Sequence, residues 1–139
     1  RIKGDVTIVV DEEIKFEDNA QITFFNSSST LALSSSGKLT IENNSQINVA
    51  SADPNKLTLY HDSTENVEMK EDAKMYAHVI VSNAEFKMKD QTQFFGTIRA
   101  YKVKMEDSAI ANISYGIGEG PVDFGPASTG IKVQWLEKP

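Results

Sequence analysis

A nine-residue pattern recurs five times in this chain of 139 residues and constrains its fold more than any other feature. Positions one, three and nine are apolar, position four is charged, positions five and six are polar turn formers, and position seven is small. Apolar residues two apart place their side chains on one face of a strand, and the polar pair then turns the chain. One copy cannot bury its apolar face alone, whereas a stack of copies can. The copies begin at Ile14, Leu39, Val67, Phe86 and Val103.

A second short segment with apolar residues two apart precedes each copy, at residues 6–8, 31–33, 57–59, 79–81 and 98–100. Because equivalent positions recur in the same order, parallel stacking is favoured over a series of hairpins, whose strands would alternate in direction. Sustained helical spacing is missing. Residues 1–115 are therefore predicted to form an all-β domain, a right-handed single-stranded parallel β-helix (solenoid) of about five turns.

The repeat stops after about Ser114. Residues 116–130 are rich in glycine and proline, which indicates a loop, and residues 131–136 alternate once more, which predicts a final strand. Because the open edge of a solenoid invites aggregation, residues 116–139 are predicted to form a C-terminal loop and capping strand. Trp135 is expected to cover apolar surface there.

The charge and cysteine content exclude several classes of function. The net charge is −6, which argues against a broad nucleic-acid-binding or anionic-membrane-binding surface, because both need a basic stripe. The chain has no cysteine, so disulfide, iron–sulfur and thiolate–zinc chemistry are absent. This composition fits an extracellular bacterial protein. No stretch is apolar for long enough to span a membrane, so membrane attachment is expected only through a segment that this sequence lacks.

The turn positions of the copies carry many acidic and amide side chains. If the copies stack one strand spacing apart, carboxylates such as Asp72, Asp90 and Asp107 could line up and supply oxygen ligands to Ca²⁺. Such residues also form turns by bonding to their own backbone, and no calcium-loop motif accompanies them. We interpret them as turn formers and predict no cofactor, with Ca²⁺ at these three residues as the alternative.

An active site would interrupt the repetition. Polysaccharide-cleaving enzymes need paired carboxylates that converge in a cleft, or a base and a metal on one face. Here the acidic residues are spread over turns and outward rows, so no catalytic residue is predicted. His61 and His78 are expected on the surface, away from any serine constellation. The glycine-rich run at residues 116–120 precedes Pro121 rather than a helix, so it is interpreted as a loop and not as a phosphate site.

Positive charge gathers in the last two copies. Stacking would place Glu68 beside Lys87 and Lys89 beside Glu106, so acidic neighbours dilute this charge. A site for nucleic acid is not expected, and the group is a candidate patch for an acidic partner. The patch consists of Lys87, Lys89, Arg99, Lys102 and Lys104.

Residues 53–60 (DPNKLTLY), 75–86 (MYAHVIVSNAEF) and 93–98 (QFFGTI), with the turn Asp107-Ser-Ala, resemble the β-solenoid of PilX-type pilus-assembly and related bacterial surface proteins. The resemblance covers roughly residues 4–115. In that family a pilin-like membrane helix precedes the solenoid, and no catalytic residues are established. The resemblance therefore implies a place in a surface or pilus assembly, with other subunits of that assembly as partners.

These observations favour a non-catalytic structural or adhesive module of a bacterial cell-surface or pilus-associated protein. Such a module would present a rigid surface to sister subunits, to a glycan or to a host surface. One alternative is a polysaccharide-binding or polysaccharide-cleaving β-helix, which a cleft lined by aromatic residues and facing carboxylates would favour. A further alternative is a bactofilin-like polymer, in which solenoids stack end to end.

Overall fold

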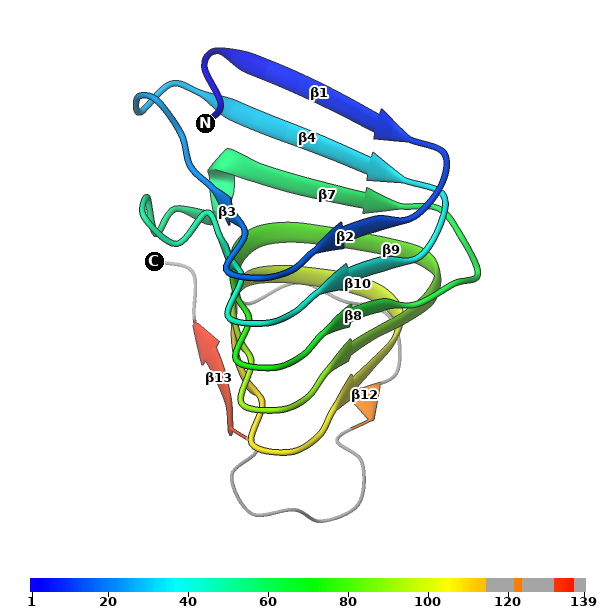
Figure 1. The fold of residues 1–139 in the computed structure, drawn as a ribbon. Helices are drawn as coiled ribbons and strands as arrows, with labels where there is room; N and C mark the ends of the chain where they lie inside the picture. Colours follow the sequence, from blue (N-terminus) through cyan, green and yellow to red (C-terminus); the bar gives the residue numbers. More distant parts are fainter. Residues whose placement is uncertain (115–121, 124–131, 137–139) are drawn as a thin grey trace.

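The computed structural model describes residues 1–114, 122–123 and 132–136. In this part the chain is all-β, apart from one short 3₁₀ helix, η1 (Pro54–Lys56). Its thirteen strands belong to one sheet, and every strand pair is parallel. The sheet curls around an apolar interior (Figure 1). Within the described residues, no helix has the length and apolar character that crossing a membrane would require.

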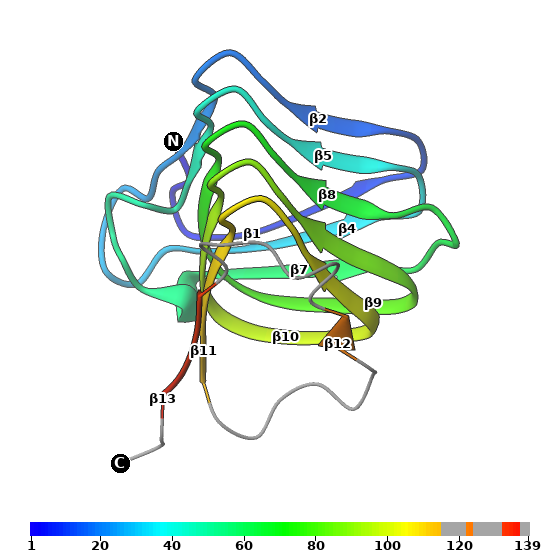
Figure 2. The same ribbon diagram turned by 90° about the horizontal axis from the view of Figure 1, so that it is seen from below.

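The strands fall into three series, each of which runs from copy to copy. Figure 2 shows β2, β5 and β8 on one side of the molecule, and β4 and β7 on the other. The long strands β9 and β10 turn the corner and pair in more than one series. The strands are β1 (Asp5–Val10), β2 (Ile14–Phe16), β3 (Gln21–Ile22), β4 (Thr30–Ser35), β5 (Leu39–Ile41), β6 (Gln46–Ile47), β7 (Leu57–His61), β8 (Val67–Met69), β9 (Lys74–Met88), β10 (Gln93–Met105), β11 (Ile110–Ser114), β12 (Val122–Asp123) and β13 (Lys132–Leu136).

The nine-residue copies stack in register, as their sequence predicts. Position one of each copy pairs with position one of the next, from Ile14 through Leu39, Val67 and Phe86 to Val103. Each apolar position therefore lies on the equivalent apolar position of its neighbour. Because one face of every strand is buried, a slip by one residue would turn the apolar set outward, and the pattern fixes the register.

The polar pair at positions five and six adopts left-handed backbone conformation in all five copies, with φ between 50° and 65°. Asn and Asp tolerate this conformation better than other non-glycine residues, which explains their frequency here. The position-six N–H donates to the position-five carbonyl of the next copy, as from Asn19 to Asn43 at 2.9 Å and from Gln91 to Asp107 at 2.9 Å. Position seven is buried in the last four copies, as at Ala73 and Ala109, so only a small residue fits there.

The interior is filled by the apolar positions of all three series. Phe86 and Phe94 pack edge to face, with ring centroids 5.6 Å apart and an interplanar angle of 69°. Four methionines are fully buried beside them, and their unbranched side chains fill irregular gaps. These are Met69, Met75, Met88 and Met105.

A buried amide holds the insertion between β6 and β7. The side chain of Asn48 is fully buried and its Nδ2 donates to the carbonyls of Asp53 at 2.7 Å and Tyr76 at 3.0 Å. One bond shapes the insertion, and the other ties it to β9. The insertion and η1 are thereby fixed against the sheet.

The two ends of the described chain differ. β1, β2 and β3 each pair along one edge only among the described residues, and several apolar side chains there are only partly buried, including Val6, Val10 and Phe16. At the other end, the predicted final strand is present as β13, which pairs with β11, and β12 pairs with β10. The remainder of the predicted loop at 116–130, and the side chain of Trp135, lie outside the described residues.

Candidate functional site

The outward side of β2, β5 and β8, with the second halves of β9 and β10, carries a ladder of ion pairs, which we call the charged face. Its closest contacts join Lys15 to Glu17 at 2.6 Å and to Glu42 at 2.8 Å, and Lys70 to Glu42 at 2.7 Å. Further along, Lys104 contacts Glu106 at 2.6 Å. Most of the charged side chains named on this face therefore pair with one another.

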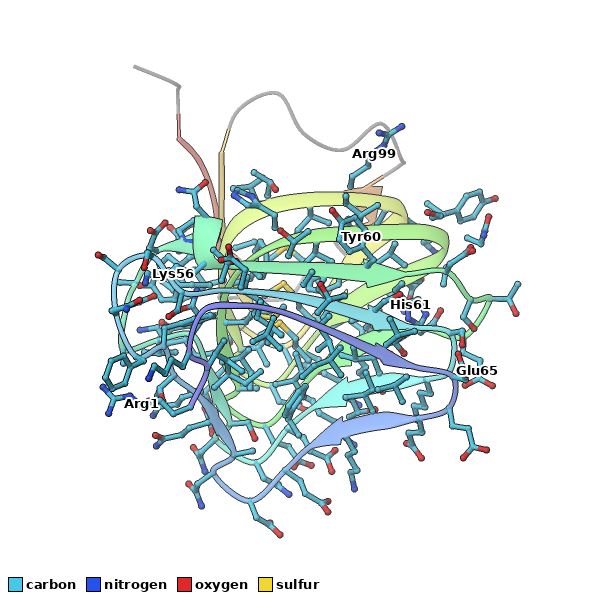
Figure 3. All side chains as sticks on the ribbon, turned by 90° about the horizontal axis from the view of Figure 1, so that it is seen from above. Arg1, Lys56, Tyr60, His61, Glu65 and Arg99 are labelled. Atoms are coloured by element: carbon cyan, nitrogen blue, oxygen red, sulfur yellow. The ribbon has the colours of Figure 1, made fainter. Side chains whose placement is uncertain are left out.

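The predicted basic patch is divided and neutralised. Lys87, Lys89 and Lys104 lie on the charged face, and Lys102 lies beside it after the register shift in β10. Arg99 lies before that shift and projects from the other wall (Figure 3). Each of the four lysines contacts a carboxylate. The pairs are Lys87 with Glu106, Lys89 with Glu68, Lys102 with Glu85 and Lys104 with Glu106.

The expected neighbours on this face are in register, but Glu68 and Lys87 each form an ion pair with a diagonal neighbour. Glu68 lies opposite Lys87, as predicted, yet Glu68 contacts Lys89 at 3.3 Å. Long side chains reach a diagonal neighbour as easily as the residue directly opposite. The register alone therefore does not determine which charges meet.

Glu42 is the centre of the most buried ion pairs. Its residue is only 5% exposed, and its carboxylate bridges lysines from the copies on either side. Hydrogen bonds from Lys15 first and Lys70 second hold the pKa of Glu42 below its ordinary value. The bond to Glu42 in turn raises the pKa of Lys70. A hydrogen bond from Lys104 likewise lowers the pKa of Glu106.

Glu42→Gln should lower the free energy of unfolding at neutral pH by about 1 kcal/mol, because Lys70 loses the carboxylate that it contacts and Lys15 keeps only Glu17. The lowered pKa means that the carboxylate stabilises the fold above the ordinary glutamate value of 4.5 and loses this effect as the pH falls below it. Urea midpoints at pH 7 and pH 3 should therefore differ less in the variant. Glu17→Gln, which alters a half-exposed partner of the same lysine, should change them less; equal effects would contradict the bridging role.

The metal candidates lie in the turns. Asp90 and Asp107 occupy position five and Asp72 occupies position six, so the three are not equivalent in the stack. Their backbones are part of the turn ladder: the Asp72 N–H donates to the Asp90 carbonyl at 3.0 Å. No group of three or more histidine, cysteine or acidic side chains in the described part of the chain is placed to hold a metal ion.

The expectation that His61 is exposed is wrong, because its residue is only 1% exposed. The inward alternation of Leu57 and Leu59 extends to His61, which stacks between Ser35 and Val81 of the neighbouring strands. Its Nε2 lies 2.5 Å from the Glu65 carbonyl, and its Nδ1 has no hydrogen-bond partner among the described residues. Figure 3 shows it at the corner of the sheet, near the loop that carries Glu65.

His78 lies on the outer side of β9, as expected, and is half-buried. Its Nε2 is 3.0 Å from Asn55 Oδ1, and its Nδ1 is 2.6 Å from Thr97 Oγ1. Because the amide oxygen can only accept, Nε2 carries a proton, and in the neutral imidazole Nδ1 then accepts from the hydroxyl. Burial lowers the pKa of His78, which favours this neutral form of the imidazole.

The wall opposite the charged face is almost free of charge, and sequence analysis missed it. We call its outward side chains on β4, β7 and the first halves of β9 and β10 the uncharged face. The signal was available, since residues 30–35, 57–61, 75–81 and 93–98 contain no lysine, arginine, aspartate or glutamate. It was hidden because β9 and β10 continue from this wall into the charged one.

A family model described as a domain of unknown function (DUF7305) matches residues 2–115. No curated protein matches the chain, and no solved structure does so either. The matched residues include the five nine-residue copies and both faces.

Proposed function

Since this chain belongs to the DUF7305 family, whose function is unknown, we propose from its own architecture that it is a non-catalytic structural or adhesive module. It acts by presenting a rigid surface to sister subunits, to a glycan or to a host surface. The setting is the surface of a bacterium, in a pilus-associated or related assembly. This setting rests on the resemblance to PilX-type solenoids.

The proposed architecture is a right-handed single-stranded parallel β-helix of about five turns with a C-terminal cap. The in-register pairing of equivalent positions supports it, as does the separation of the strands into three series. Each turn of this β-helix contains one nine-residue copy and the strand segment before it.

The observation that carries the proposal is the continuous backbone ladder through every turn. The backbone N–H of position four donates to the carbonyl of position three in the preceding copy, as from Glu42 to Phe16 at 2.9 Å. The N–H of position eight donates to the carbonyl of position seven in the preceding copy, as from Gln46 to Ala20 at 2.8 Å. Together with the position-six bonds, these contacts leave little freedom between copies. Most acidic residues of the nine-residue copies lie in turns or pair with lysines, and this arrangement suits a scaffold better than a reaction.

Adhesion and catalysis can be measured on the same preparation. Beads coated with the chain should attach under flow to a surface coated with polysaccharide or with the same chain, and no reducing ends should be released from any polysaccharide offered. Release of reducing ends in proportion to the amount of chain would contradict the non-catalytic role. Attachment no stronger than that of beads coated with heat-denatured chain would contradict the adhesive role.

The open edge at β1 favours a second candidate, a polymer in which copies of the chain stack end to end. Val9 lies in β1, and its side chain is exposed beside this edge. Unpaired strand edges readily accept another strand. In this case sedimentation would show oligomers that grow with concentration, and Val9→Lys would reduce them. A monomer at all concentrations would exclude this candidate.

A further inference from the structure

The uncharged face is unusual for this molecule. Charged residues make up 24% of the chain, so four strand segments without one are a marked departure. The charged residues beside it lie at its borders, and they include Asp5 on β1, Asp53 before η1, Lys74 at the start of β9 and Arg99 in β10. A charged partner would find few charged groups to pair with on this wall. A neutral partner could cover the wall at little cost, because few charged side chains would be buried without a partner.

The outward side chains of this face form rows that cross the strands. The first row is Ala32, Thr58, His78 and Thr97, each opposite the next in register, and Thr7 on the neighbouring β1 continues it beyond the face. A second row, parallel to the first, is Ser34, Tyr60 and Ile80, and it ends at Arg99. Neighbouring strands are spaced ~4.8 Å apart, so the first row presents threonine hydroxyls at every second strand, and the second row presents the side chains of Tyr60 and Ile80 side by side.

The polar side chains of His78 and Thr97 in the first row are held by hydrogen bonds within the protein before any partner binds. Asn55 in η1 accepts from His78, which accepts from the Thr97 hydroxyl. Asn55 is itself held by Asp53, through its backbone N–H at 3.0 Å and its Nδ2 at 2.9 Å. A preorganised set of neutral groups loses little freedom on binding.

Aromatic side chains lie beside these groups, and two of them, Tyr76 and Phe95, border the Lys74 ammonium, which is 5.9 Å and 5.2 Å from their ring centroids. Tyr60 is 45% exposed on the second row. Tyr76 and Phe95 lie in line on adjacent strands and stack with ring centroids 4.3 Å apart and an interplanar angle of 7°. Rings with an apolar face and a nearby polar tip suit a ligand that alternates C–H and hydroxyl groups.

We propose that the uncharged face binds a neutral polysaccharide, which lies across the strands along the two rows. The C–H faces of its sugar rings pack on Tyr60 and Ile80, and its hydroxyl groups bond to the hydroxyls of Thr58 and Thr97, the latter held in place by His78. This inference rests on the proposed adhesive function and names its ligand class. Nucleic acids and acidic polysaccharides are disfavoured because the face offers no cationic row.

Affinity electrophoresis in native gels tests this proposal. The chain carries a net charge of −6, so it migrates towards the anode, and gels cast with a soluble neutral glucan, galactomannan or xyloglucan should retard it. Gels cast with polygalacturonate should not. Tyr60→Ala should weaken the apparent affinity about tenfold, since removal of an exposed aromatic anchor commonly has that effect. Ile80→Glu places a charge on the face and should abolish binding. This variant should therefore migrate equally far in gels with and without the neutral polysaccharide.

The matched control is Tyr101→Ala, because Tyr101 is 66% exposed and lies at the register shift in β10, outside the uncharged face. It should leave retardation unchanged, and circular dichroism should show all three variants folded. No retardation by any neutral polysaccharide, or equal losses in Tyr60→Ala and Tyr101→Ala, would overturn the inference.

Two other readouts separate this inference from the function on which it rests. Sedimentation of the same variants detects self-association, and a dimer that Tyr60→Ala disrupts, without neutral-glycan retardation, would assign the face to a second copy instead. Reducing ends released during incubation would contradict the non-catalytic function itself. Bead attachment to the same chain, without glycan retardation, would overturn only the inference.

Discussion

Gly96→Ala is expected to lower the free energy of unfolding by about 3–5 kcal/mol, from backbone strain and overpacking together. Gly96 has φ of 137°, which side-chain-bearing residues rarely adopt, and a Cβ there would lie 1.9 Å from the Ala77 carbonyl oxygen of the neighbouring strand. That oxygen belongs to the backbone of β9 and cannot move without breaking the register. Urea denaturation followed by circular dichroism should show the loss, or little folded protein should be recovered.

Gly4→Ala is the matched control for this substitution. Gly4 also has positive φ, at 77°, but nothing lies within 4 Å of a Cβ built there. Only the conformational term remains, so its effect should be about 1–2 kcal/mol. Similar shifts of the urea midpoint in the two variants would show that the close contact with β9 is unimportant.

Phe86→Ala should lower the free energy of unfolding by about 3–5 kcal/mol, because truncation of a buried aromatic leaves a cavity. Phe86 is fully buried, packs edge to face on Phe94 and pairs in register with both Val67 and Val103. Its loss removes contacts on both sides of one copy. The midpoint of urea denaturation measures the effect.

Phe25→Ala provides the comparison, because Phe25 is 50% exposed and contacts mainly the side chains of Arg1 and Lys3. It should change the midpoint little. If Phe86→Ala were equally mild, the interior between the third and fifth copies would have to be far less tightly packed than its burial indicates.

The register was predictable from sequence because one pattern encodes three requirements at once. Positions one and three must face inward, positions five and six must adopt left-handed conformation, and position seven must be small. A slip by one residue would violate all three, so the five copies align in only one way. The same reasoning explains why Asn43, Asp72 and Asp107 are turn residues, without reference to any ligand.

The faces were less predictable, because the sequence does not mark where β9 and β10 turn the corner. Residues 74–88 form one strand, yet His78 faces outward on one wall and Lys87 on the other. Proximity in the sequence therefore predicts one patch that contains both Arg99 and Lys104, although the two residues lie on different walls. His61 was missed because a strand's inward alternation was assumed to end before it. The contacts of Asn48 depend on an insertion whose path only the tertiary structure defines.

The backbone ladder also determines how the molecule responds to force. Hydrogen bonds between copies run along the direction in which the copies stack, perpendicular to the strands. Tension along the stacking direction therefore loads the interfaces between copies in series, and the weakest interface separates first. Tension along the strands shears every bond of an interface simultaneously. The resistance of the chain to force therefore depends on direction, and it is greatest for tension along the strands.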